Sequence, residues 1–555
     1  MSMNTGETES KTENQNENSD SEKEKRTAHT AALTLGILCI VVGLPLWWKT
    51  TEVYRFSLPY SDIQHLSDKK IEYLIEAEVI WASPVKKDAL FLTDLAQHLN
   101  RFLGIQQHHA SRLSSIFRVS VREGETSELV AIQKVTKLAD LENILSSDNL
   151  NKYNIVVVKE SSIITQPLIA PKNCIFLPYN GADVNGLTAQ IAHLLLDVSR
   201  NNDVAKSMET AQGLKLQRPD KDTMRSFRYH AGYDLTFTLM VPEPEQMNVD
   251  WTIEQGIEDY LSPLVKSLEE YTQISVTSQI LYLVSLGGKP KNNDGFYFYS
   301  EQDLPHVINP LETKLGSHAS NNPGLNFIVC IPARDKSPLH LVDNNGVPIA
   351  SNAFLSPRWG GIMIYNIDTV NSSSHQSSPV DVDIHRVMEV FVTQLRLLLN
   401  IHPQWMTKDL MVLNTGSSEL HMWELSGWLR CRCVENLVTA TSTLQSLAKL
   451  LEEIGNIVIN DEIGKEVEAA VAAIEESQLL LKNGKLKEAF LASKAAFNAS
   501  ELAFFHPSLL ELLYFPEDQK FAIYIPLFLP ISIPVVTSVI QALRWFKQQK
   551  KLKSD

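Results

Sequence analysis

Two long stretches without charged residues lie near opposite ends of this 555-residue chain. Residues 31–48 read AALTLGILCIVVGLPLWW, and residues 521–543 are likewise free of charge. At about 1.5 Å per residue, the shorter stretch spans roughly 27 Å as a helix, close to the hydrocarbon thickness of a bilayer. The sequence therefore predicts two transmembrane helices, at residues 31–48 and 521–543, that flank one large folded body.

The first stretch has two alternative interpretations, a signal peptide and a buried core helix. A signal peptide has an apolar core of about 7–15 residues followed by small residues at the cleavage site. This run is longer and ends in Trp47 and Trp48, side chains that suit a membrane–water interface. We therefore favour a membrane anchor.

Basic residues indicate the orientation of both helices. The tail at residues 544–555 carries five Lys or Arg residues and one acidic residue, so this end is expected in the cytosol. Lys25 and Arg26 precede the first helix and are candidate contacts for anionic lipid, although neighbouring Glu residues dilute the signal and a merely solvated tail is the alternative. The interpretation places both termini in the cytosol and the body between the helices in a lumen.

Composition limits the class of protein. Apolar residues make up 44% of the chain and charged residues 21%, as in globular proteins. The formal net charge of −15 argues against a general nucleic-acid-binding protein. Residues 1–30 form a polar tail, which we expect to lie in the cytosol. We expect it to be disordered, because residues 1–27 have too little apolar surface to offset the entropy of ordering.

The body begins as an α/β mixture. Apolar residues alternate along a strand at residues 71–81, and the pattern continues with the helices and short strands expected of α/β or mixed α+β layers through residues 49–430. Further helices are predicted at 89–103, 187–198, 253–271 and 387–399, strands at 116–121, 155–158, 174–177, 235–241, 274–286, 327–331 and 362–365, a polar linker at 203–226, and a loop or insertion at 287–324.

A helical region follows the α/β part. From residue 437 to residue 505 only helical periodicity is present, broken by a turn at Asn483-Gly484. We expect a lumenal helical hairpin bundle within residues 431–520.

Catalytic motifs are missing from the sequence. It contains no HExxH, GxSxG, P-loop or dinucleotide-binding fingerprint, so no catalytic residue, metal ligand or cofactor is predicted. Four cysteines lie in the body, Cys174, Cys330, Cys431 and Cys433, and their pairing stays open. The Cys431-Arg432-Cys433 spacing fits neither a zinc site nor a redox pair and favours thiols in a helix.

Two modification sites and one retrieval signal are candidates. Asn371 and Asn498 each begin an Asn-x-Ser glycosylation sequon, the first in a Ser-rich loop and the second in a predicted helix. Lys551 and Lys553 form a K-x-K-x-x ending, which resembles the retrieval signal of endoplasmic reticulum membrane proteins.

Several motifs resemble one protein family. Residues 43–51 (GLPLWWKTT), 58–60 (LPY) and 354–363 (FLSPRWGGIM), together with the two-helix layout, are similar to the phosphatidylinositol glycan class S family. The 358–361 segment has two interpretations, a contact site and a strand-initiating turn with Trp359 in the core.

The resemblance implies a non-catalytic subunit of glycosylphosphatidylinositol (GPI) transamidase in the endoplasmic reticulum membrane. That complex removes a C-terminal signal from a proprotein and joins the new end to a GPI lipid. The family's nucleophile belongs to a different, cysteine-protease-like subunit, so the implied partners are the other subunits and membrane lipids, with proprotein and GPI lipid met only indirectly. The alternatives are a lumenal adaptor of another membrane complex and a lumenal enzyme with an unrecognised site.

Overall fold

The computed structural model places the chain in two compact units. Unit 1 combines residues 1–58, 446–466 and 502–555, and unit 2 combines residues 59–445 and 467–501. The structure describes residues 23–552 except 44, 47–48, 50–53, 84–87, 106–111, 143, 146, 162, 180, 182, 214–229, 294, 316–319, 368–377, 402–409, 414–417, 455–456 and 511–516.

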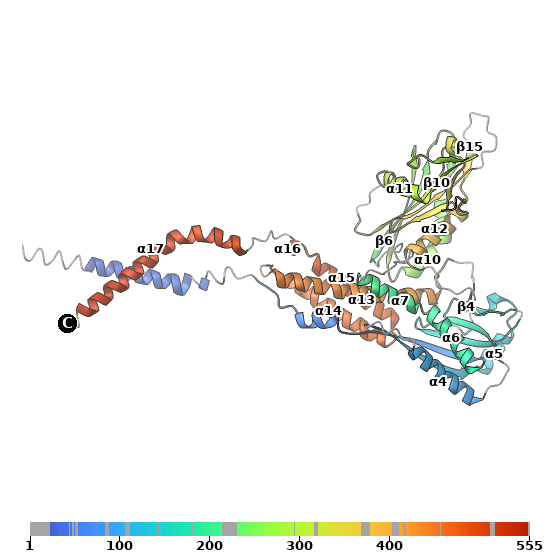
Figure 1. The fold of residues 1–555 in the computed structure, drawn as a ribbon, viewed down its shortest axis with the longest axis horizontal. Helices are drawn as coiled ribbons and strands as arrows, with labels where there is room; N and C mark the ends of the chain where they lie inside the picture. Colours follow the sequence, from blue (N-terminus) through green and yellow to red (C-terminus); the bar gives the residue numbers. More distant parts are fainter. Residues whose placement is uncertain are drawn as a thin grey trace, which may run out of the picture. The chain divides into compact units, whose positions relative to one another are not determined.

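The first sheet of unit 2 has six strands in the order β16-β4-β5-β3-β1-β2. Figure 1 draws this sheet, with β4 labelled, together with helices α4, α5 and α6. Its strands pair in parallel, except that β4 runs antiparallel to β5. Most residues of β1 and β3 are buried, as expected for the central strands of a parallel sheet. The elements are α3 (Tyr60–Leu66), β1 (Ile71–Trp81), α4 (Ala89–Ile105), β2 (Leu113–Glu123), α5 (Thr126–Gln133), η2 (Leu138–Leu141), β3 (Lys152–Lys159), β4 (Leu168–Ala170), β5 (Cys174–Tyr179), α6 (Val184–Val198), α7 (Asn201–Ala211) and β16 (Met411–Val412).

The second sheet has five strands in the order β13-β14-β11-β6-β8. It too is parallel except for one antiparallel pair, β13 with β14. Its elements are β6 (Gly232–Val241), α9 (Ile253–Gly256), η3 (Ile257–Leu261), α10 (Ser262–Leu268), β8 (Gln273–Tyr282), β11 (Gly324–Cys330), β13 (Ala353–Ser356), β14 (Gly360–Ile364) and α12 (Ile384–Leu398), with β7 (Met247–Asp250) and β15 (Ser378–Asp381) forming a separate pair.

The two sheets repeat one topology. In each, the first strand (β1 or β6) lies between an edge strand (β2 or β8) and a third strand (β3 or β11). A hairpin follows, β4–β5 or β13–β14. Its second strand pairs in parallel with the third strand of the sheet, and its first strand pairs antiparallel with the second. A long helix, α6 or α12, comes after the hairpin. Both hairpins turn over three residues that begin with Pro and a basic residue, Pro171-Lys172-Asn173 and Pro357-Arg358-Trp359. Unit 2 therefore contains the same α/β arrangement twice.

The helices that close the two repeats begin and end alike. Asp183 and Asp383 cap α6 and α12 by accepting a hydrogen bond from the backbone three residues on. Arg200 and Asn400 follow the two helices in the left-handed conformation, with φ of 55° and 57°. The Arg200 guanidinium donates to the Asn400 carbonyl at 2.9 Å, so the ends of the two repeats meet.

Helix α13 (Met422–Glu453) holds both of these helix ends from one side. Arg430 donates to the Ser199 carbonyl at 2.8 Å, directly after α6. Arg432 and Trp428 donate to the Leu399 carbonyl at 3.0 and 2.9 Å, directly after α12. Carbonyls at a helix C-terminus lack partners within the helix, so α13 satisfies both ends.

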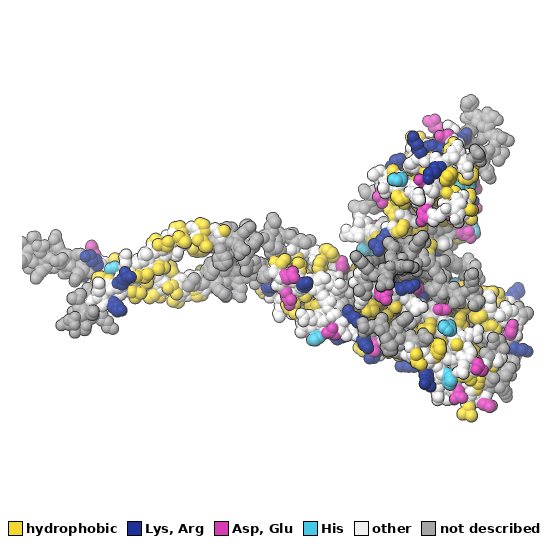
Figure 2. All heavy atoms as spheres, viewed as in Figure 1, with side chains coloured by type: hydrophobic (Ala, Val, Ile, Leu, Met, Phe, Trp, Pro, Cys, Tyr) yellow, Lys and Arg dark blue, Asp and Glu magenta, His cyan; other side chains and the backbone are white. Residues whose placement is uncertain are grey.

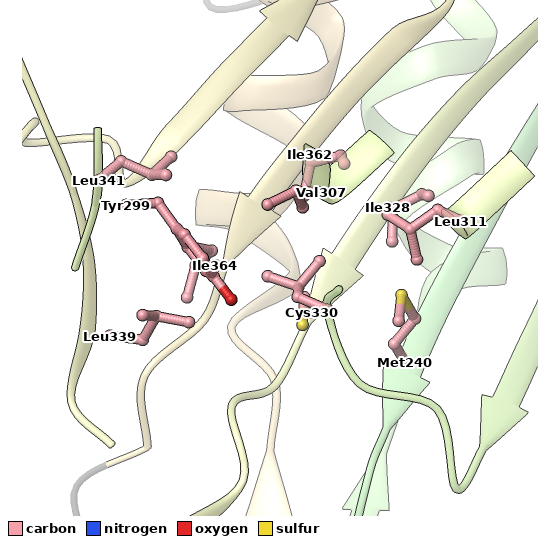
Figure 3. Close-up of a cluster of buried hydrophobic side chains, with 11 residues drawn as sticks. Met240, Tyr299, Val307, Leu311, Ile328, Cys330, Leu339, Leu341, Ile362 and Ile364 are labelled. Atoms are coloured by element: carbon pink, nitrogen blue, oxygen red, sulfur yellow. The ribbon is translucent and has the colours of Figure 1, made fainter. Parts of the chain in front are cut away.

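An insertion distinguishes the second repeat. Residues 287–324, predicted as a loop or insertion, form β9 (Lys291–Asn293), β10 (Phe296–Ser300), η4 (Glu301–Asp303) and α11 (Leu304–Glu312), and β10 pairs with β9 and with β12 (Leu339–Val342). Their apolar side chains meet those of β6, β11 and β14 in one core (Figure 3). The buried cluster comprises Met240, Leu286, Tyr299, Val307, Leu311, Ile328, Cys330, Leu339, Leu341, Ile362 and Ile364.

Helices make up the C-terminal part, as predicted, but they begin earlier. Helix α13 starts at Met422, before the predicted start of the helical region at residue 431, and α14 (Asp461–Lys482), α15 (Leu486–Phe504), α16 (Pro507–Leu510) and α17 (Glu517–Leu552) follow. The predicted polar linker from residue 203 is wrong at its start, because α7 continues to Ala211. The result is a mixed α/β fold with C-terminal helices and an apolar helix near each terminus.

Candidate functional site

The N-terminal apolar helix is described from Lys23 to Gly43 and is long and apolar enough to cross a membrane. Its last turn is a π-helix, η1 (Cys39–Gly43). Its large apolar side chains are more than half exposed, which is costly in water and favourable in lipid. They are Leu35, Leu38, Ile37, Ile40, Val41 and Val42.

Helix α17 provides the second candidate span, at Phe528–Gln548. It continues through Pro526, Pro530 and Pro534, each of which lacks the N–H that would bond one turn back. The Thr537 and Ser538 hydroxyls donate to carbonyls of the preceding turn, at Ile533 and Pro534. Figure 2 shows hydrophobic side chains along both terminal helices.

The two apolar helices contact each other in an antiparallel sense within unit 1. The His29 and Trp545 rings lie 5.1 Å apart, and a Cβ on Gly36 would meet the Val539 side chain. Beside this contact, an apolar groove of about 760 Å³ runs between the helices. Sequence reasoning missed the pairing, for which the available signal was the spacing of Gly36 and Gly43 on one helix face.

The segment that follows the N-terminal helix is joined to the segment between α13 and α14. Phe56 and Ile459 share a backbone hydrogen bond of 2.9 Å, and the Tyr54 hydroxyl donates to the Asp461 carboxylate at 2.6 Å. The Phe56 ring packs against Gly464, where a Cβ would collide with it. Within unit 1, these contacts join chain segments that are far apart in sequence; Tyr54 and Asp461 are separated by 407 residues.

The site residues predicted from the sequence lie on different elements of the structure. Lys25 and Arg26 are exposed on the N-terminal helix. Asn498 is half-buried in α15, whereas Asn371 and Lys553 lie outside the described residues. Lys551 belongs to α17, and its side chain is not described.

The four cysteines of the body are free and buried in unit 2. Burial raises the pKa of the Cys330 thiol to about 12 and that of Cys433 to about 11, and it also raises the pKa of Cys174 and Cys431. A thiol with a raised pKa is a poor nucleophile because the thiolate is the reactive form. Cys431 and Cys433 lie in α13, in agreement with the interpretation as thiols in a helix.

The 358–361 segment is the turn of the β13–β14 hairpin. Trp359 is partly buried against the core cluster of the second sheet, and Arg358 adopts a φ of 55°. Gly360 has a φ of 145°, and a Cβ there would collide with the Asn326 carbonyl. These features favour the interpretation as a strand-initiating turn. Within the described residues, no group of three or more His, Cys, Asp or Glu side chains is placed to hold a metal ion.

A folded α/β body between two candidate membrane-spanning helices defines a membrane protein with an apolar helix near each terminus. Residues 34–549 match the family described as phosphatidylinositol-glycan biosynthesis class S protein, and the chain belongs to this family.

Named relatives cover nearly the whole chain. It is 38% identical over 538 residues to the "GPI-anchor transamidase component PIGS" of Homo sapiens, which spans 94% of this chain and 96% of the relative. It is 25% identical over 540 residues to the "GPI transamidase component PIG-S homolog" of Schizosaccharomyces pombe, across 94% of this chain and 85% of the relative. The "GPI transamidase component GPI17" of Saccharomyces cerevisiae is 24% identical over 534 residues, across 92% of this chain and 91% of the relative.

Proposed function

We propose that this chain is a non-catalytic subunit of the GPI transamidase of the endoplasmic reticulum. This complex attaches a GPI anchor to the C-terminus of proproteins after removal of their signal. The observation that carries the proposal is the match, over more than nine-tenths of the chain, to relatives named as transamidase components in a mammal and two yeasts.

Both apolar helices would cross the membrane, with both termini in the cytosol and residues 49–520 in the lumen. The contact of His29 with Trp545 supports this topology, because it brings the basic ends of the two helices together. Lys25 and Arg26 would then face anionic head groups, and Lys551 and Lys553 would be exposed to the cytosolic retrieval machinery.

The lumenal body would act as a scaffold beside the catalytic, cysteine-protease-like subunit. The burial of all four body cysteines supports a role without a nucleophile of its own. The partners are then the other transamidase subunits and membrane lipids, while proprotein and GPI lipid are met through the complex.

Glycosylation is proposed at both sequons, with different requirements. Asn371 lies in a Ser-rich segment of the sequence. The Asn498 sequon includes Ser500, which is fully buried and donates its hydroxyl proton to the Phe497 carbonyl at 2.8 Å. Modification of Asn498 would therefore have to occur before α15 packs.

Deletion and rescue in cells test the proposed function. Cells that lack this protein should lose GPI-anchored proteins from the surface, measured by flow cytometry, and should accumulate proproteins with uncleaved signals. Re-expression of the full chain should restore both. Normal surface levels in the deleted cells would contradict the proposal.

Protease digestion of sealed microsomes tests the topology separately. A fragment that contains the whole body should be protected until detergent is added, while tags at both termini are removed. Digestion of the body in intact vesicles would overturn the lumenal placement.

A further inference from the structure

Strand β8 forms one edge of the second sheet, and its backbone pattern can be assigned. The Gln273 N–H donates to the Ala231 carbonyl at 3.0 Å, and the Leu283 N–H donates to the Val241 carbonyl at 2.9 Å. Because parallel strands bond through alternate residues, the intervening odd-numbered residues face β6 and the even-numbered ones direct their N–H and C=O outward. Those outward residues are Ile274, Val276, Ser278, Ile280 and Tyr282.

This outward edge is unpaired in the part of the chain that the structure describes. No described strand lies beyond β8, and no described residue is bonded to the five outward N–H groups. The strand is ten residues long and contains no buried residue. A long edge of this kind presents a row of donors and acceptors to which another strand can be added.

The first repeat supplies an internal reference, because β2 occupies the corresponding edge. The Gly124 N–H donates to the Trp81 carbonyl just as that of Leu283 donates to that of Val241, which aligns Val119 with Ser278. At Val119 the edge is covered. The Asn100 side chain of α4 accepts from the Val119 N–H at 3.1 Å and donates to its carbonyl at 2.9 Å, as a neighbouring strand would.

The two edge strands, β2 and β8, also differ in their charged residues. Strand β2 carries Arg118 and Arg122, which pair with Glu76 and Glu78 of β1 at 3.0 and 2.9 Å. Strand β8 carries no charged residue, and none follows until Lys289. Proteins protect free edges with charges or covering side chains, so β2 has both forms of protection and β8 lacks them among the described residues.

The surface beside β8 is open and partly apolar. Tyr282 and Leu283 are 58% and 77% exposed. A hollow of about 540 Å³ adjoins Ser278, between the strand and residues 251–255. The Trp251 indole nitrogen near this hollow is buried and has no hydrogen-bond partner among the described residues.

We propose that β8 is a docking edge that another subunit of the transamidase extends with one strand of its own. The inference rests on the proposed function, which supplies the partner complex. Hydrogen bonds along the even-numbered residues would provide the affinity, and the uncharged faces around Ile280 and Tyr282 would select an uncharged, β-branched strand. A permanent subunit is favoured over a passing proprotein, because an uncharged ten-residue edge left open is prone to aggregate.

A matched pair of proline variants tests the edge in the full chain. Ile280→Pro removes an outward N–H of β8, and Val121→Pro removes the outward N–H at the corresponding position of β2. Each tagged variant is expressed in cells that lack the protein, and the known transamidase subunits that co-purify in mild detergent are quantified by mass spectrometry. We expect Ile280→Pro to lower their recovery about tenfold or more, and Val121→Pro to leave it unchanged.

Hydrogen exchange on the wild-type protein needs no variant. In the assembled complex, the amides of residues 274, 276, 278, 280 and 282 should exchange far more slowly than in the isolated chain. A photo-reactive side chain at Tyr282 should cross-link to a second transamidase subunit and identify it.

The outcomes separate this inference from the proposed function. Unchanged recovery with Ile280→Pro, or rapid exchange of the five amides in the complex, would overturn the docking edge. A cross-link only to a second copy of this chain, or only to proprotein, would overturn it as well. If the wild-type chain recovers no transamidase subunit, the proposed function itself fails.

Discussion

The contact of Arg430 with both the end of α6 and strand β3 gives the most direct test of how α13 holds the first repeat. Arg430 is 1% exposed and has no carboxylate partner among the described residues. It donates to the Ser199 carbonyl at 2.8 Å and to the Tyr153 hydroxyl at 3.0 Å. A third and longer hydrogen bond joins Arg430 to the Ser426 hydroxyl at 3.4 Å. The variant Arg430→Met keeps an unbranched apolar stem and removes all three hydrogen bonds.

The expected cost is worked from the two shorter bonds, to Ser199 and Tyr153. Hydrogen bonds to a charged group contribute about 1.5 kcal/mol or more each, which gives about 3 kcal/mol for the pair. Removing a buried cation also removes its desolvation penalty, which offsets part of this sum. A net loss of about 2 kcal/mol should lower the melting temperature by about 4 °C at roughly 2 °C per kcal/mol.

Thermal unfolding of the full chain in detergent, followed by tryptophan fluorescence, measures this loss. The control is Arg118→Met, because Arg118 pairs with Glu76 on the surface and is 71% exposed; its loss should cost at most about 0.5 kcal/mol. In a cycle with Tyr153→Phe, the coupling to Arg430 should be about 1 kcal/mol. If Arg430→Met melts at or above the wild-type temperature, the claim that the hydrogen bonds of Arg430 stabilise the fold is refuted.

Three further predictions concern single positions in unit 2. Asn100→Ala should lower stability by about 1–2 kcal/mol and speed amide exchange at Val119, since it uncovers the edge of β2; unchanged exchange would contradict the assignment. Gly360→Ala should reduce the yield of folded protein far more than Gly104→Ala, because only the first glycine has a positive φ and meets a carbonyl; equal yields would refute the steric argument. Hydrogen bonds from Ser300, with Lys291 adding a further bond and its charge, lower the pKa of Asp303 from 3.8 to about 2. The ionised form is favoured in the folded state, so the stability that Asp303 adds is complete above pH 3.8 and is lost as the pH falls toward 2; melting curves of Asp303→Asn and wild type should converge over that range.

The sequence predicted elements best where one face or one run of residues is apolar. The strand at 71–81 was located residue for residue, and the helices near 89–103, 187–198 and 387–399 differ from the structure by three residues or fewer at each end. Periodicity failed where a helix is buried on all sides. The first half of α13 mixes Arg430, Glu424 and Arg432 with apolar residues and keeps nearly all of them buried, so it has no polar stripe to detect.

The repeat and the open edge could not be predicted from the sequence, and the spacing of Gly36 and Gly43 was the one signal for the pairing of the apolar helices. The two repeats share their topology but few residues, mainly a Pro–basic turn in each hairpin and an Asp cap before each closing helix, so their relation becomes visible once the strand order is known. The edge position of β8 likewise depends on pairing between strands far apart in the chain. Its signal in the sequence is an uncharged run up to Lys289, which by itself equally fits a buried strand.

The contacts of α13 with the ends of α6 and α12 constrain the order in which the protein can fold during its synthesis. The Ser199 carbonyl at the end of α6 can be hydrogen-bonded only after Arg430 has been synthesised. The hydrogen bond from Arg432 to the Leu399 carbonyl can form at the same stage. At about 5–20 residues per second, the first repeat waits roughly 10–50 s for the residues that complete it. During that interval, the end of α6 lacks its hydrogen-bond partner because α13 has not yet been synthesised, and folding chaperones can bind the incomplete repeat.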